Sequence, residues 1–378
     1  MRKKVKTGVC KAAQLRDGSR HPFGMLGGVT ALGGGELEVY QQIRNAVPIL
    51  DAAIGKLVRL TGGFTVSCGN RKAERELERF LKTVNAGRGQ VGLESFLAAF
   101  LQSMLVYGRA VGEMVVGGNE ITAVLWGDVT KLYVQEGTSA MEFAFGQWQD
   151  GEVKIFPRQN LILFAAWNPD EENPYGASVF RSMPFLVDVL LKIYSTIGTN
   201  WERAGNVRYS VVYKPQDEAG RIDAQERSEQ IASQWSQAMQ ESRHGVVRDF
   251  VAVGDVEIKV IGADGQILDS EVPVRQILEQ LVAKTGLPPF LLGLNWASTE
   301  RMSAQQTDLL TSELWAIRRT VEPVLLRICR LWMQLHGYAE EPEIVWDEIS
   351  LQDIVEQAHA ALYRAQAEKL TAEQEETT

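Results

Sequence analysis

Two clusters of carboxylates are the side chains best suited to bond chemistry. They comprise Asp170, Glu171 and Glu172 in WNPDEENPYG, and Asp347, Glu348 and Asp353 in EIVWDEISLQD. Carboxylates are hard ligands for Mg²⁺ or Ca²⁺, and two-metal nucleases use such groups. Each cluster also has a structural interpretation. The first has the composition of a turn between two prolines, and the second holds Ser350 and Asp353 at helix N-cap spacing. We favour the structural interpretation and expect no metal and no cofactor.

Conventional catalytic motifs are missing from the rest of the sequence. No G-x-x-x-x-G-K-[ST] loop occurs, so the chain is not a conventional P-loop packaging ATPase. The four histidines are far apart and form no H-E-x-x-H motif. The three cysteines form no C-x-x-C pair, which suits a reducing cytosol and argues against structural zinc. We therefore expect a protein that is not an enzyme.

A short loop with one large aromatic residue is the most promising binding element. It comprises Leu294, Asn295, Trp296, Ala297, Ser298 and Thr299. The side chain of Asn295 can donate to a phosphate, and Trp296 offers a broad ring face and one N–H donor. Lys284 and Arg301 are the nearest cations. An alternative interpretation packs Trp296 into its own subunit as an anchor and pairs the two cations with neighbouring subunits.

Two helices must position this loop. The first begins near Val274, has its apolar residues on one face, and stops at Gly286-Leu287-Pro288-Pro289. The second begins after Thr299, a suitable N-cap. Its apolar seam is Leu310, Leu314, Ile317, Val321, Val324, Ile328, Leu331 and Leu335, a heptad pattern. Pro323 lies inside that pattern and removes a backbone donor, so we expect this helix to kink.

The chain upstream alternates between helical and strand-like patterns. From Leu37 an apolar seam steps helically as far as Gly62, and helices follow at about 71–85 and 93–107. Short β-like runs between Arg109 and Ala166 indicate an antiparallel meander. The predicted elements after the meander are a helix at about 178–204, a strand at 207–215, a helix at about 223–241 and strands near 247–261. The 178–204 helix is apolar on more than one side, which predicts burial against several neighbours, other subunits among them.

Composition narrows the choice of function. The chain has 378 residues, of which 45% are hydrophobic and 23% charged, and no apolar run reaches the ~20 residues of a membrane span. Its net charge of -9 does not suit a conventional DNA-binding protein, whose affinity comes mainly from cations that neutralise phosphates. Like charge on a channel wall would let a polyanion slide without sticking.

The order of these parts resembles the portal proteins of tailed bacteriophages. The resemblance rests on a helix, the break GLPPFLLG, a loop and a long helix that contains a proline, together with an upstream stem-like segment, NPYGASVFRSMPFLVDVLLKIYSTIGTNWERAGNVRYSVVYKP. It covers about residues 37 to 350 and implies an α+β, portal-like fold. The implied parts are a basic N-terminal arm (1–36), a wing of helices and β meander (37–175), a stem helix (176–205), a small α/β clip (206–262), a second stem helix (263–286), a channel loop (287–300), a long kinked helix with a wing strand (301–349), and a short crown-like helix with an acidic tail (350–378).

The resemblance also implies a function. It predicts a homo-oligomeric, dodecameric ring at one capsid vertex of a virion, made in the host bacterial cytoplasm. Double-stranded DNA would pass through the ring, with residues 294–299 lining its narrowest part. The implied partners are the terminase large subunit, the major capsid or scaffolding protein and a neck or tail adaptor, with no membrane. Two alternatives stay open: a head-to-tail adaptor, and a metal-dependent nuclease that uses one of the acidic clusters.

Overall fold

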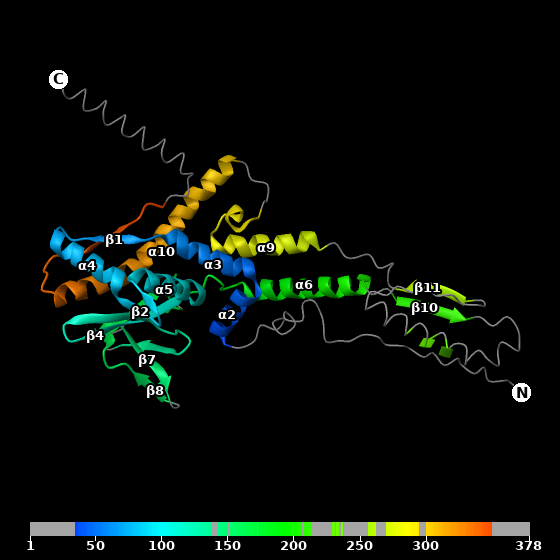
Figure 1. Ribbon diagram of the computed structural model, residues 1–378, viewed down its shortest axis with the longest axis horizontal. Coiled ribbons are helices and arrows are strands. Elements are labelled where there is room, and N and C mark those ends of the chain that lie inside the picture. Colours follow the sequence, from blue (N-terminus) through cyan, green and yellow to red (C-terminus); the bar gives the residue numbers. More distant parts are fainter. Residues whose placement is uncertain are drawn as a thin grey trace, which may run out of the picture. The chain divides into compact units, whose positions relative to one another are not determined.

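The computed structural model describes residues 35–137, 142–149, 152–171, 173–205, 208–213, 229–230, 232–233, 236, 256–261, 270–294 and 300–349 (Figure 1). The predicted N-terminal arm, most of the clip, residues 295–299 of the channel loop and the C-terminal tail lie outside these residues. The chain divides into two compact units, Met1–Ala31 with Val189–Val274, and Leu32–Asp188 with Arg275–Thr378. Each unit is described by itself. Within the described part, no helix has the length and hydropathy that a membrane span needs.

Helices form the core of the larger unit. They are α2 (Glu36–Ala46), α3 (Pro48–Thr61), α4 (Arg71–Thr83) and α5 (Leu93–Tyr107). The single helix predicted from Leu37 to Gly62 is wrong, because the chain breaks at Val47 and Pro48 starts a new helix. Proline lacks an N–H and has a fixed φ, so it suits a first helical position. The side chain of Asn70 caps α4 by accepting from two backbone N–H groups.

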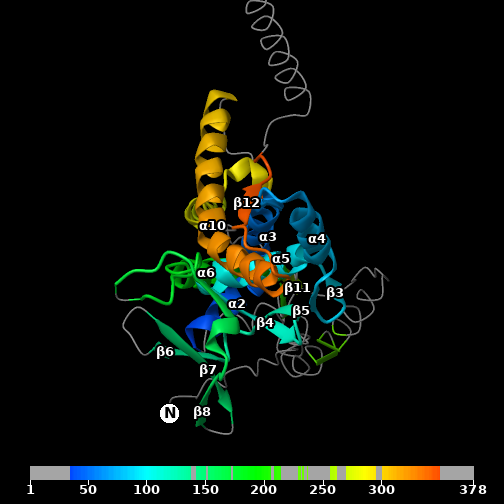
Figure 2. The same ribbon diagram turned by 90° about the vertical axis from the view of Figure 1, so that its left-hand side faces the viewer.

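In the described part of the larger unit, three sheets accompany these helices. A five-stranded sheet has the order β3 (Gln90–Val91), β2 (Asn85–Gly87), β5 (Glu120–Trp126), β4 (Arg109–Gly117), β9 (Ile162–Ala166). A three-stranded antiparallel sheet comprises β6 (Leu132–Glu136), β7 (Phe143–Gln149) and β8 (Glu152–Ile155). The third pairs β1 (Phe64–Ser67) with β12 (Glu343–Trp346). The strands of the predicted meander are thus divided between two sheets. Strands β4, β5 and β9 belong to the five-stranded sheet, in which β4 pairs with both β5 and β9 and β2 joins β5 in parallel, whereas β6, β7 and β8 form a sheet of their own. Figure 2 shows β4 and β5 below the helices and β12 beside α3.

The helix predicted at 178–204 is α6, which runs from Pro184 to Gly205. It begins later than expected because the Ser178 hydroxyl accepts from Phe180 N, which holds the preceding residues in turns. Val187, Leu190 and Leu191 are buried, whereas Phe185 and Trp201 are 74% and 65% exposed. The smaller unit contains the antiparallel pair β10 (Arg208–Tyr213) and β11 (Val256–Ile261). Helix α9 runs from Glu271 to Thr285.

The long helix α10 (Glu300–Leu335) is continuous through Pro323. Its predicted seam is buried from Leu310 to Ile328, but Leu331 and Leu335 are only half-buried. Beyond Pro323 the buried side chains also include Leu325, Cys329, Trp332 and Met333. The apolar stripe therefore drifts around the helix, which packs on α3, α4, β9 and β12 of its own unit. Figures 1 and 2 both show that the axis of α10 changes direction along its length.

Candidate functional site

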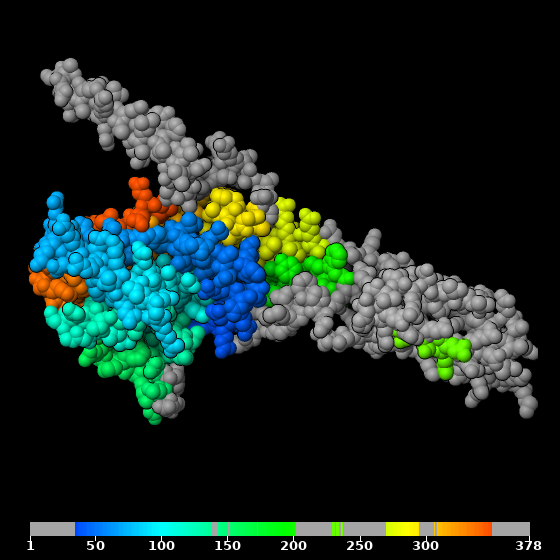
Figure 3. Space-filling view, viewed as in Figure 1, coloured from blue at the N-terminus to red at the C-terminus, as the bar shows by residue number. Residues whose placement is uncertain are grey.

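The first flank of the predicted channel loop is closed by local contacts. On the first side, α9 ends at Thr285, whose hydroxyl donates to Val282 O (2.7 Å) and accepts from Leu287 N (3.3 Å). Gly286 follows with φ +72°, a value that glycine adopts without strain. The two prolines then open a 3-10 turn, η2 (Pro289–Leu292), which packs against α3. Figure 3 shows this contact at the surface, where blue atoms of α3 adjoin yellow atoms near residue 290. The stop predicted from Gly-Leu-Pro-Pro is therefore present.

The candidate DNA-contacting residues are only partly placed. Leu294 is half-buried and its N–H donates to Pro289 O (3.1 Å). Residues 295–299, with Asn295, Trp296, Ala297, Ser298 and Thr299, lie outside the described residues, as does the side chain of Arg301. Lys284 is exposed in the last turn of α9, and Pro323 is exposed on α10. The role of this loop stays a prediction.

One carboxylate of each acidic cluster has structural partners, and Glu172 and Asp353 lie outside the described residues. In the first, Asp170 accepts from Asn173 N (2.6 Å) and pairs with Arg181 (3.1 Å), as a turn residue would. In the second, the Asp347 side chain accepts from Gly63 N (3.1 Å), while Asp347 N donates to Gly63 O (3.1 Å). These two bonds close the end of the β1–β12 pair. Among the described residues, no three His, Cys, Asp or Glu side chains gather to hold a metal ion.

A set of close backbone approaches fixes the segment that leads into α6. We call it the junction and define it as Gly108, Trp167, Gly176, Ala177 and Ser178. Trp167 N donates to Gly108 O (2.7 Å), and Ala177 N donates to Trp167 O (2.7 Å). The Ser178 hydroxyl donates to Val106 O (2.5 Å) at the end of α5. Because α6 starts a few residues later, the junction sets where the predicted stem helix leaves the larger unit.

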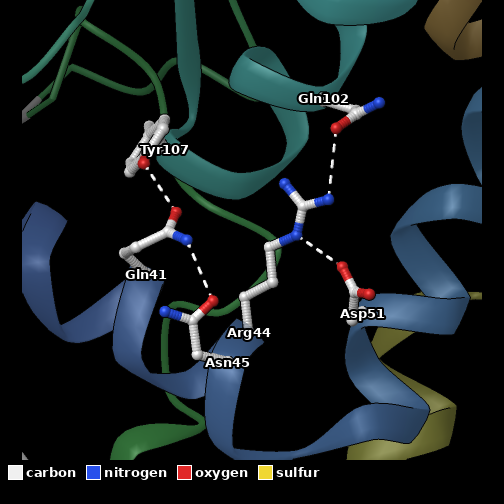
Figure 4. A network of polar contacts seen from close by, with 6 residues as sticks. All are labelled: Gln41, Arg44, Asn45, Asp51, Gln102 and Tyr107. Atoms are coloured by element: carbon white, nitrogen blue, oxygen red, sulfur yellow. Dashed lines mark hydrogen bonds and ion pairs between the residues drawn. The ribbon is translucent and has the colours of Figure 1, made fainter.

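A polar network ties α2 and α3 to α5 (Figure 4). Arg44 bonds to Asp51 (2.5 Å) and to Gln102 (3.1 Å), and Tyr107 donates to Gln41 (2.8 Å). A groove of about 780 Å³ lies beside it, lined by Arg44, Gln102, Tyr107 and residues near Trp126. Since Arg44 is already paired with a carboxylate, the network serves to fix the helices rather than to bind an anion.

Sequence reasoning missed one unusual side chain. Arg318 lies on the buried side of α10 and is only 1% exposed. Its Nε donates to Thr61 O (2.8 Å), and its guanidinium lies over the rings of Trp315 (5.0 Å) and Trp346 (5.1 Å). Burial lowers the pKa of Arg318, and the charge of Asp347 opposes that shift. One sign of this site is present in the sequence: Arg318 follows Ile317 and so interrupts the apolar stripe of α10.

Comparison with known proteins finds solved structures with a similar fold. No protein-family model and no curated protein matches the sequence. A chain from the neck of an empty gene transfer agent particle, computed with C6 symmetry, aligns with a TM-score of 0.64 at 18% identity, over 89% of this chain and 91% of that one. A chain from the neck of the native particle, computed with C12 symmetry, aligns at 0.62 with 17% identity, over 91% and 93%.

An HK97 family phage portal protein from Corynebacterium diphtheriae aligns more loosely, with a TM-score of 0.46 and 10% identity over 81% of this chain and 94% of that one. The two neck chains share the fold of this chain along nearly its whole length. The predicted α+β fold is therefore confirmed, and the resemblance to proteins of phage-like particles is confirmed at the level of the fold.

Proposed function

We propose that this chain is the portal subunit of a tailed phage or of a phage-derived particle. Copies of it would form a ring of twelve at one capsid vertex, through which double-stranded DNA is packaged and later leaves. The observation that carries the proposal is the shared fold, over about nine-tenths of both chains, with a protein from a particle neck computed with C12 symmetry. Closed rings arise when head-to-tail interfaces return to the first subunit.

Features of the chain itself support this assignment. Phe185 and Trp201 on α6 are exposed although they are large and apolar, as expected of side chains that another subunit covers. The net charge of -9 suits a conduit better than a protein that grips DNA. Asp170 and Asp347 have structural partners, which favours a role without bond chemistry over a metal-dependent nuclease. That distinction is tested directly by incubating plasmid DNA with the protein and Mg²⁺, where we expect no cleavage.

The portal role carries further proposals. The terminase large subunit would dock on the clip during packaging, and a neck or tail adaptor would dock there afterwards. The major capsid or scaffolding protein would surround the wing. The protein would be made in the host cytoplasm and would reside in the virion.

A head-to-tail adaptor is the second candidate, because the similar chains come from structures described as necks. Proheads isolated before packaging separate the two roles: a portal is already present in them, whereas an adaptor joins after the DNA has entered.

Measuring the oligomeric state of the protein is the most direct test of the proposal. End-on averages by electron microscopy should show a ring with a central hole, and mass photometry should give about twelve chains of 42.0 kDa. A protein that stays monomeric over a wide range of concentration and salt would contradict the portal and the adaptor alike.

A further inference from the structure

Arg318 has unused hydrogen-bond donors in a buried position. A guanidinium carries five N–H donors. The single N–H of Nε donates to Thr61 O, the last carbonyl of α3. Nη1 and Nη2 carry the other four and are buried, yet neither has a hydrogen-bond partner within the described structure. The side chain as a whole is 1% exposed.

The surroundings stabilise the charge of Arg318 without satisfying these donors. Trp315 and Trp346 lie over the guanidinium and attract it through their ring faces. The carboxyl end of α3 favours a cation through the helix dipole. Neither supplies a hydrogen-bond acceptor to Nη1 or Nη2, and the Asp347 carboxylate, whose charge also favours the cation, accepts from Gly63 N instead (3.1 Å). A buried charged group with unused donors is costly, so an acceptor from elsewhere would be strongly favoured.

The unused donors lie just beneath the surface of the larger unit. Gly62 is exposed, and a Cβ added to it would lie 3.0 Å from Nη2, so Nη2 lies close beneath an exposed glycine. Trp315, one turn before Arg318 on α10, is 44% exposed although it is large and apolar. Helix α10 contacts both α3 and β12, so these residues form one continuous face. We call it the Arg318 face and define it as Gly62, Trp315, Arg318 and Trp346.

We propose that the Arg318 face is a contact between adjacent subunits and receives an Asp or Glu side chain from the neighbouring copy. This inference rests on the proposed ring. An Arg fork matches a carboxylate through two parallel hydrogen bonds, and Trp and Arg are the residue types that dominate interface energies. The occupant is a second copy because the proposed ring places one beside every subunit, and the 48 Asp and Glu residues of the chain offer the carboxylate. In a head-to-tail ring the face and its acidic partner are different surfaces of one chain, so every copy offers both.

Assembly and folding measured on the same variants test this inference. Arg318→Met removes the charge and keeps an apolar side chain of similar length, and Trp315→Ala changes a residue that the fold leaves partly exposed. Arg330→Met is the matched control, because Arg330 lies on the same helix and forms an exposed pair with Glu341 (2.8 Å). Mass photometry gives the concentration at which half of the chains are in rings. Thermal unfolding of dilute, dissociated protein gives the stability of the subunit.

We expect Arg318→Met to raise the half-assembly concentration by ~10-fold or more, since the neighbouring carboxylate loses its partner. Trp315→Ala should raise it in the same direction, and Arg330→Met should leave it within about twofold. The unfolding midpoint of the dissociated Arg318→Met subunit should change little, because the removal of a buried charge offsets the loss of the bond to Thr61 O. If that variant does not fold, the assembly of Trp315→Ala decides.

Four results would overturn the inference. A lower unfolding midpoint with unchanged assembly would make Arg318 a cap of α3 and nothing more. A rise in the unfolding midpoint of dissociated wild type with inorganic phosphate, absent in Arg318→Met, would assign the face to a free anion. If Arg318→Met and Trp315→Ala both form rings as readily as the wild type does, the Arg318 face is not a subunit contact, and the proposed function is unaffected. If the wild-type protein forms no ring, both the inferred subunit contact and the proposed function are wrong.

Discussion

Replacing Gly176 with alanine tests how firmly the junction holds the base of α6. Gly176 has φ +95°, and a Cβ added there would lie 2.0 Å from Gly108 O and 2.9 Å from Trp167 N. These atoms are backbone and cannot rotate away. An alanine must therefore break the hydrogen bonds from Trp167 N to Gly108 O and from Ala177 N to Trp167 O, and separate the end of β9 from the end of α5.

The expected loss follows from the parts that change. The left-handed conformation costs an alanine about 1–2 kcal/mol, and each buried backbone bond left unmade costs about 1–3 kcal/mol. Together they predict a loss of at least about 3 kcal/mol in the free energy of unfolding, or a fall of about 1 M in the urea midpoint. Gly118→Ala is the control, because Gly118 has φ +63° with nothing within 4 Å of the added Cβ. It isolates the conformational cost. If Gly176→Ala is no less stable than Gly118→Ala, the junction does not hold α6.

Three further changes have defined outcomes. Pro323→Ala should restore a backbone hydrogen bond in α10 and raise the thermal unfolding midpoint, while ring yield by electron microscopy falls; normal rings and normal packaged particles would show that the bend is dispensable. A variant with Asn295→Gly and Trp296→Ala should still form rings and proheads but retain packaged DNA poorly; loss of ring assembly would instead make Trp296 a structural anchor. Glu74 accepts N–H bonds from the Cys68–Gly69 turn, which lower its pKa from 4.5, so its contribution is complete above pH 4.5 and lost as the pH falls through the lower value. Glu74→Gln should therefore lower the urea midpoint at pH 7 and flatten its fall below pH 4.5, and equal acid sensitivity in both proteins would exclude this role.

Local patterns predicted the helices well where tertiary contacts agreed with them. Residues 93–107 form α5 as expected, because nearly every apolar position on it finds a neighbour. The stop after Thr285 depends on Gly286 and two prolines, whose effect is local. Where the prediction failed, a local signal had been outweighed by a longer pattern. The seam from Leu37 to Gly62 continues through Pro48, yet the proline divides it into α2 and α3.

The sheet order and the Arg318 face could not be read from local patterns. The β1–β12 pair joins residues 64–67 to residues 343–346, and no short-range feature of either strand specifies the other. Likewise, Thr61, Trp315, Arg318 and Trp346 meet only because α10 packs across α3 and β12. Arg318 by itself resembles a polar residue that interrupts an apolar seam, and its importance lies in what surrounds it. The channel loop is the opposite case, because its flanks are predictable and its contacts are not.

Helix α3 connects the inferred subunit contact to the first flank of the channel loop. The turn η2, which ends the first flank of the channel loop, packs against α3, and so does α10, which begins at the second flank. Arg318, one of the residues of α10 at that contact, bonds the last carbonyl of α3. The first flank of the loop therefore packs on α3, whose carboxyl end lies at the face where a neighbouring carboxylate would dock, and the second flank is joined to α3 through α10. A contact that reorders Arg318 acts first on the end of α3, and α3 supports the first flank of the loop through η2. In such a ring both the subunit contact and the position of the channel loop depend on α3. We therefore expect that a substitution that disrupts the subunit contact also shifts the loop.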